Sequence, residues 1–131
     1  MNLQGQHLGV YQSVQATTAD PARLVVLLFD GAIRFLRQAA EGLDRGEIDI
    51  FATRVSRAQA IIAELSASLD HEAAGDLGAS LARLYDFMGS HLTRGLIGRN
   101  GATAREVIGL LQELREGFEG ARARAGGDAA P

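Results

Sequence analysis

Proline is nearly absent from the interior of this chain, and this constrains its fold more than any other feature. Of two prolines among 131 residues, one is Pro21 and the other is the terminal Pro131, so the residues between them meet no proline that would break a helix. Aromatic residues make up 5% of the sequence, whereas β-sandwiches are normally richer in aromatic strand formers and turn prolines. We therefore expect a protein of long helices.

Two helices are predicted in the first half of the chain. The pair Asp20 and Pro21 favours a helix start, because Asp accepts a hydrogen bond from an early backbone N–H and proline at the first helical position loses none. This helix is expected to run to position 43 or 44 and to stop at Gly46. A second helix begins at Ile48, and its apolar residues follow at alternating steps of three and four, the spacing of one helix face. They are Phe51, Val55, Ala58, Ile62, Leu65 and Leu69.

Two more helices are predicted in the second half. The stretch 70–75 breaks the second helix, Asp76 can cap the third, and the third is expected to end within 95–101. Thr103 is followed three residues later by Glu106, which is the spacing of a capping box at the start of the fourth helix. Four helices of about twenty residues with short connections favour an all-α, antiparallel up-down four-helix bundle with an N-terminal arm.

The predicted boundaries divide the chain into three parts. Residues 1–19 are polar and weakly patterned and are expected to form a flexible arm or lid. Residues 20–125 form the bundle, and the glycine-containing tail 126–131 is expected to be disordered. The length of the chain suits one domain with one core.

The composition excludes several classes of protein. Without cysteine there is no disulfide, thiolate nucleophile or thiolate metal site, and the cytoplasm is the expected compartment. The net charge of −3, with no clustering of the thirteen basic residues, argues against a nucleic-acid partner. The longest apolar run, Leu24 to Phe29, is far shorter than the ~20 residues that span a bilayer, and no signal peptide is recognisable. We expect no membrane insertion.

No pattern indicates an enzyme. Di-iron bundle proteins place a Glu-x-x-His motif on two helices, and none of the three histidines has glutamate three residues before it. A serine-hydrolase elbow of the form Gly-x-Ser-x-Gly is absent as well. We therefore assign no catalytic residue, no metal ligand and no cofactor. His91 is expected to be a partly buried structural histidine and His71 to be solvated, while Asp30 is expected to form a surface ion pair with Arg34.

The first predicted helix carries more apolar surface than a bundle helix needs. At 100° per residue its apolar side chains cover an arc of roughly 200°, whereas a face somewhat wider than ~100° is enough for a bundle. Two explanations stay open: a central helix that touches the three others, or a surface covered by the N-terminal arm or by a partner. The third predicted helix shows a weaker excess, at Tyr85, Phe87 and Leu92.

Several short blocks along residues 11–118 carry a family resemblance. They read Tyr11-Gln12-Ser13-Val14, Thr18-Ala19-Asp20-Pro21, Leu28-Phe29-Asp30-Gly31-Ala32, Ala58-Gln59-Ala60-Ile61-Ile62 and Leu84-Tyr85-Asp86-Phe87-Met88. In these blocks the chain resembles the flagellar secretion chaperone FliS family. The family usually has Tyr where this chain has Phe29, and commonly Ser where it has Asp20.

The resemblance implies a cytoplasmic export chaperone. Such a chaperone binds the disordered C-terminal segment of flagellin, prevents premature polymerisation and delivers the subunit to the flagellar type III export gate. A segment that is disordered alone and amphipathic when ordered needs a long apolar groove on which to fold. We expect a monomer whose partners are this segment and the export gate. A helical homo-oligomeric structural or adaptor module without flagellin binding is the alternative.

The candidate groove is placed on the first and third predicted helices, where the apolar excess and the family-like blocks coincide. Its residues are Leu28, Phe29, Ala32, Ile33, Phe35, Tyr85, Met88, Leu92 and Leu96. The arm looks like the family's lid segment, which occupies apolar surface when the client is absent. Its candidate lid residues are Leu8, Val10, Tyr11 and Val14.

Overall fold

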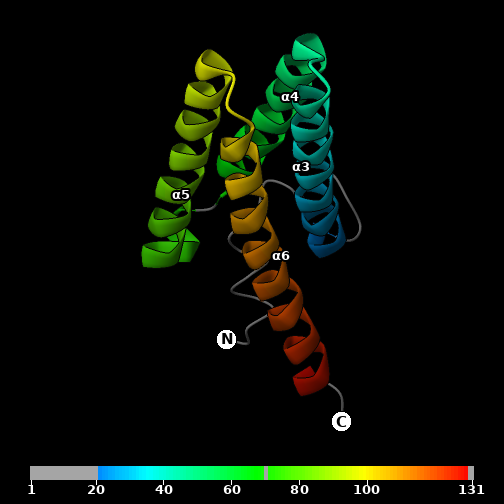
Figure 1. Cartoon of the computed structure of the whole chain (residues 1–131). Coiled ribbons are helices and arrows are strands. Elements are labelled where there is room, and N and C mark those ends of the chain that lie inside the picture. Colours follow the sequence, from blue (N-terminus) through cyan, green and yellow to red (C-terminus); the bar gives the residue numbers. More distant parts are fainter. Residues whose placement is uncertain (1–20, 70, 130–131) are drawn as a thin grey trace.

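The computed structural model describes residues 21–69 and 71–129 of the chain. Over these ranges the backbone forms four helices and no strand (Figure 1). The helices are α3 (Pro21–Asp44), α4 (Ile48–Ala67), α5 (His71–Gly98) and α6 (Gly101–Ala129). Successive helices run in opposite directions, and α3 and α5 each pack against both α4 and α6. The predicted antiparallel up-down four-helix bundle is confirmed, while the predicted arm, residues 1–19, lies outside the described residues.

The turn between α3 and α4 forms where the sequence predicts it. Gly46 has a φ of 76°, in the left-handed region that glycine adopts without steric cost. The N–H of Gly46 donates to the carbonyl of Leu43 (2.9 Å), and the N–H of Glu47 donates to that of Gly42 (2.8 Å). These two bonds close the last turn of α3 as a Schellman motif. The predicted stop at Gly46 and the predicted start of α4 at Ile48 are both confirmed.

The start of α5 is irregular. The helix begins at His71, but Gly75 leaves the helical region with φ 56° and ψ −126°. This interruption falls within the predicted break at 70–75, so the regular part of α5 runs from Asp76.

The start of α6 differs from the prediction. The helix begins at Gly101, and the side-chain oxygen of Asn100 accepts a hydrogen bond from the N–H of Ala102 (3.0 Å), so Asn100 is the capping residue. Thr103 instead donates its hydroxyl to the Asn100 carbonyl (2.9 Å), and Glu106 contacts α5. The predicted capping box is therefore wrong, because Thr103 and Glu106 already lie inside the helix.

The end of α6 also differs from the predicted boundary. The sequence places the end of the bundle at 125 and a tail at 126–131, whereas the helix continues to Ala129. Glycine costs about 1 kcal/mol relative to alanine inside a helix, which is why Gly126 and Gly127 favour an earlier stop at the sequence level.

The core of the bundle is centred on α3. Eleven of the 24 residues of α3 are buried. Helix α4 approaches closely because glycine leaves room for it: a Cβ on Gly42 would lie 2.8 Å from Cγ2 of Ile50, and one on Gly31 would lie 3.3 Å from Cδ1 of Ile61. Helix α3 packs against α4 on one side and α6 on the other, and these two contacts bury most of its wide apolar surface.

Candidate functional site

Most of the predicted groove residues lie in the core. Phe29, Ala32 and Ile33 of α3, and Tyr85, Met88 and Leu92 of α5, are each at most 5% exposed, whereas Leu28, Phe35 and Leu96 are half-buried. Helices α3 and α5 occupy diagonal corners of the bundle, so the two predicted halves of the groove do not form one open surface. Direct contact of these six residues with a partner stays a prediction. The predicted lid residues, Leu8, Val10, Tyr11 and Val14, lie outside the described residues.

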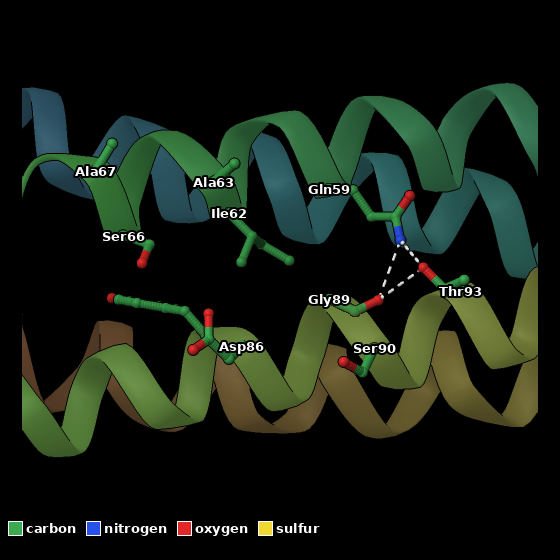
Figure 2. Close-up of a pocket in the computed structure, with 10 residues that line it drawn as sticks. Gln59, Ile62, Ala63, Ser66, Ala67, Asp86, Gly89, Ser90 and Thr93 are labelled. Carbon is green, nitrogen blue, oxygen red and sulfur yellow. Dashed lines mark hydrogen bonds between the residues drawn. The ribbon is translucent and has the colours of Figure 1, made fainter.

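An open groove lies instead between α4 and α5, with a volume of about 700 Å³ (Figure 2). Its α4 wall is formed by Gln59, Ile62, Ala63, Ser66 and Ala67, and its α5 wall by Tyr85, Asp86, Gly89, Ser90 and Thr93. We call it the α4–α5 groove. Of the predicted groove residues, only Tyr85 lines it.

Most of the residues that line the groove have small side chains or none. On α4, Ser66 points toward α5 in Figure 2, whereas the exposed Ala63 and Ala67 point away from it, and Gly89 and Ser90 line the α5 wall. A Cβ added to Gly89 would meet no atom within 4 Å, so the space beside it is free. Side chains of this size cannot fill the gap between two helices, and a volume remains that larger side chains from elsewhere can enter.

One end of the groove is closed by an amide bridge between the two helices. Nε2 of Gln59 donates to the carbonyl oxygen of Gly89 (3.2 Å) and to Oγ1 of Thr93 (3.0 Å) (Figure 2). The Thr93 hydroxyl in turn donates to the same Gly89 carbonyl (3.0 Å). These bonds hold α4 and α5 at a fixed spacing at that point, without large apolar side chains.

Asp86 brings a charge into this groove. Among the described residues that line it, Asp86 is the one charged side chain, and it is exposed. In Figure 2 its carboxylate lies on the side of α5 that faces α4. Beside it lie the buried side chains of Ile62 and Tyr85.

The seam between α3 and α6 has a different character. Nε of Arg115 donates to Oδ1 of Asp30 (2.6 Å), and Arg105 donates to Asp44 (2.6 Å). The hydrogen bond to Asp30 raises the pKa of the Arg115 guanidinium above its ordinary value. Asp30 thus pairs across the bundle rather than with Arg34, and the predicted ion pair along α3 is wrong because Arg115 reaches Asp30 from α6.

His91 connects α5 to α6. Its imidazole is half-buried, contacts the Glu106 carboxylate through Nε2 and stacks on Phe87 with ring centroids 5.1 Å apart. Nη2 of Arg94 lies 3.3 Å from Nδ1. The predicted partial burial of His91 is confirmed, while the side chain of His71 lies outside the description.

Helix α5 also exposes large apolar side chains. Leu77 and Phe87 are about half exposed, and Ile97 is 81% exposed.

Within residues 21–69 and 71–129, no group of His, Asp or Glu side chains is arranged to hold a metal ion. Across that same part of the chain, none of the helices combines the length and the apolar character needed to cross a bilayer.

The comparisons with known proteins agree on one family. Residues 4–125 match the model of the flagellar protein FliS family. The chain is 32% identical over 120 residues to the flagellar secretion chaperone FliSB of Pseudomonas aeruginosa, which covers 92% of this chain and 95% of that protein. It is 33% identical over 103 residues to the flagellar secretion chaperone FliS of Salmonella typhimurium, covering 78% of this chain and 76% of that protein. It is 29% identical over 109 residues to the flagellar secretion chaperone FliS of Bacillus subtilis, and the match covers 83% of this chain and 80% of that protein. The chain therefore belongs to the flagellar protein FliS family.

Proposed function

We propose that this chain is a cytoplasmic export chaperone that binds the C-terminal segment of flagellin, prevents its premature polymerisation and delivers it to the flagellar type III export gate. Its family membership supports the general role, since the relatives are named flagellar secretion chaperones. The observation that carries the binding step is the α4–α5 groove of about 700 Å³, walled by small side chains.

The groove suits a segment that folds as it binds. An amphipathic helix binds by laying large apolar side chains into a groove on its partner. Ser66 and Gly89 leave room for such side chains, and Ile62, which also lines the groove, is apolar. A segment that continues across α5 also covers the exposed ring of Phe87. Burial of this surface supplies the free energy that offsets the ordering of the client.

The N-terminal residues 1–19 are proposed to act as a lid over apolar surface when the client is absent. This proposal rests on the sequence, in which Leu8, Val10, Tyr11 and Val14 are the arm residues able to shield such surface. Deletion of residues 1–17 is then expected to raise the binding of a hydrophobic dye while the bundle stays folded.

The proposed function is tested by calorimetric titration with the flagellin C-terminal segment from the same organism. The parent is expected to bind one segment. Gly89→Leu places a side chain in the free space of the groove and is expected to weaken binding about tenfold or more, a loss typical of a blocked central pocket.

Gly109→Leu is the matched control, because Gly109 also has free space beside it but lies on α6. It is expected to bind like the parent. Absence of binding by the parent contradicts the proposed function, whereas equal binding by both leucine variants contradicts the groove assignment alone.

The alternative, a homo-oligomeric module, is favoured by one observation. The exposed Leu77, Phe87 and Ile97 of α5 could close an interface between copies of the chain. Light scattering separates the two functions. The chaperone function is supported if the chain is a monomer that binds the flagellin segment. The module is supported if the chain is a dimer at all concentrations and does not bind the segment.

A further inference from the structure

Asp86 is the charged group in a groove whose other described walls are apolar side chains, glycine, hydroxyls and one amide. Its carboxylate makes no ion pair or hydrogen bond with any described residue. The nearest arginine along the helix, Arg83, lies one turn away and donates to Oγ of Ser80 (3.3 Å) instead. Within the part of the chain that the structure describes, this negative charge therefore has no partner.

A partner that covers the groove reduces the solvation of this carboxylate. In the free protein, water solvates it because the side chain is exposed. A bound segment removes part of that water, and an unpaired charge in a desolvated site is costly. A basic side chain on the segment compensates the loss, while an acidic side chain at the same place is repelled.

We infer that Asp86 is a specificity-determining residue, which selects a client segment with an arginine or lysine opposite it and thereby fixes the register of that segment in the α4–α5 groove. This inference rests on the proposed function. The amide bridge of Gln59 to Gly89 and Thr93 closes one end of the groove, and Asp86 lies one turn of α5 before Gly89. Apolar contacts alone would let the segment shift along the groove by one helical turn. A charge at a defined distance from the closed end favours the one register that places a basic residue opposite Asp86.

The test is a double-mutant cycle with the flagellin C-terminal segment as the probe. Each arginine and lysine of the segment is replaced by glutamine in turn, and each peptide is titrated against the parent and against Asp86→Asn. One peptide position is expected to lose about tenfold in affinity for the parent and nothing for Asp86→Asn. Glu113→Gln, on the exposed side of α6, is the control and is expected to behave like the parent.

A charge exchange gives a readout that a purely structural role would not move. Asp86→Arg is expected to bind the normal segment poorly and to recover when the coupled basic residue is replaced by glutamate. Circular dichroism is used to check that Asp86→Asn and Asp86→Arg fold. If the parent binds but no basic position couples to Asp86, the inference is wrong and the proposed function stands. If the parent does not bind, both fall.

Discussion

Two seams on opposite sides of the same bundle are built from different residues. The α3–α6 seam is bridged by two arginine–aspartate pairs, Arg115 with Asp30 and Arg105 with Asp44. The α4–α5 groove has one amide bridge, at Gln59, and no ion pair among its described lining residues, most of which are small. Under the proposed function, the first seam holds the scaffold together and the second takes the client.

The same division separates α3 from α5. Helix α3 approaches α4 so closely that Gly42 has no room for a side chain, whereas the space beside Gly89 of α5 is free. Helix α5 also exposes Phe87 and Ile97. Substitutions in the two regions are therefore expected to affect different quantities, stability for the scaffold and client affinity for the groove.

Phe29→Ala is expected to give the largest effect on stability. Phe29 is buried at 1% exposure in the centre of α3, so its truncation leaves a cavity that lowers the free energy of unfolding by about 3–5 kcal/mol. Urea denaturation measures this change. Unchanged stability together with lost client binding would instead support the sequence-based placement of Phe29 in the groove.

Alanine at two helical glycines compares the regions directly. Gly42→Ala places a Cβ 2.8 Å from Ile50 and is expected to lower the free energy of unfolding by about 1–3 kcal/mol. Gly89→Ala meets no neighbour and is expected to raise it by about 0.5–1 kcal/mol, because alanine is the better helix former. Thermal unfolding measures both. A stabilising Gly42→Ala would contradict the close approach of α3 and α4.

Asp30→Asn is expected to have the smallest effect. The side chains of Arg115 and Asp30 are 34% and 41% exposed, so solvent screens the pair and its loss costs about 0.5 kcal/mol, less at high salt. Chemical denaturation at low and high salt measures this cost. Client affinity should not change, and a clear loss of affinity would place the client on the α3–α6 seam.

The fold predicted from the sequence is confirmed, while the predicted groove residues stay a prediction, and particular residues show why the two differ. Gly46 ends α3 through its own backbone conformation, a local signal that can be read without the rest of the structure. The start of α6 was misassigned because Asn100 and Thr103 are both good capping residues three positions apart, and only the backbone decides between them.

The groove was not predictable from any one helix. Ala63 and Ser66 on α4, and Ser90 on α5, each belong to what reads as an ordinary polar or small face. They form a groove only because α4 and α5 are neighbours, which the order of helices in space determines. A matched pair of small-residue faces on consecutive helices was the available signal. The large apolar arc of α3 favoured residues such as Phe29 as groove candidates, and the structure shows that Phe29 is buried in the core.

Thiol protection gives the most direct test of where the client binds. The chain contains no cysteine, so Ser90→Cys and Glu116→Cys each introduce a single thiol, the first in the α4–α5 groove and the second beside the α3–α6 seam. Both positions are exposed, so both thiols should react with a soluble alkylating reagent in the free protein. With the flagellin C-terminal segment added, alkylation of Ser90→Cys should slow in proportion to the fraction bound, while Glu116→Cys should react as before. Protection of Glu116→Cys with full reactivity of Ser90→Cys would contradict the account.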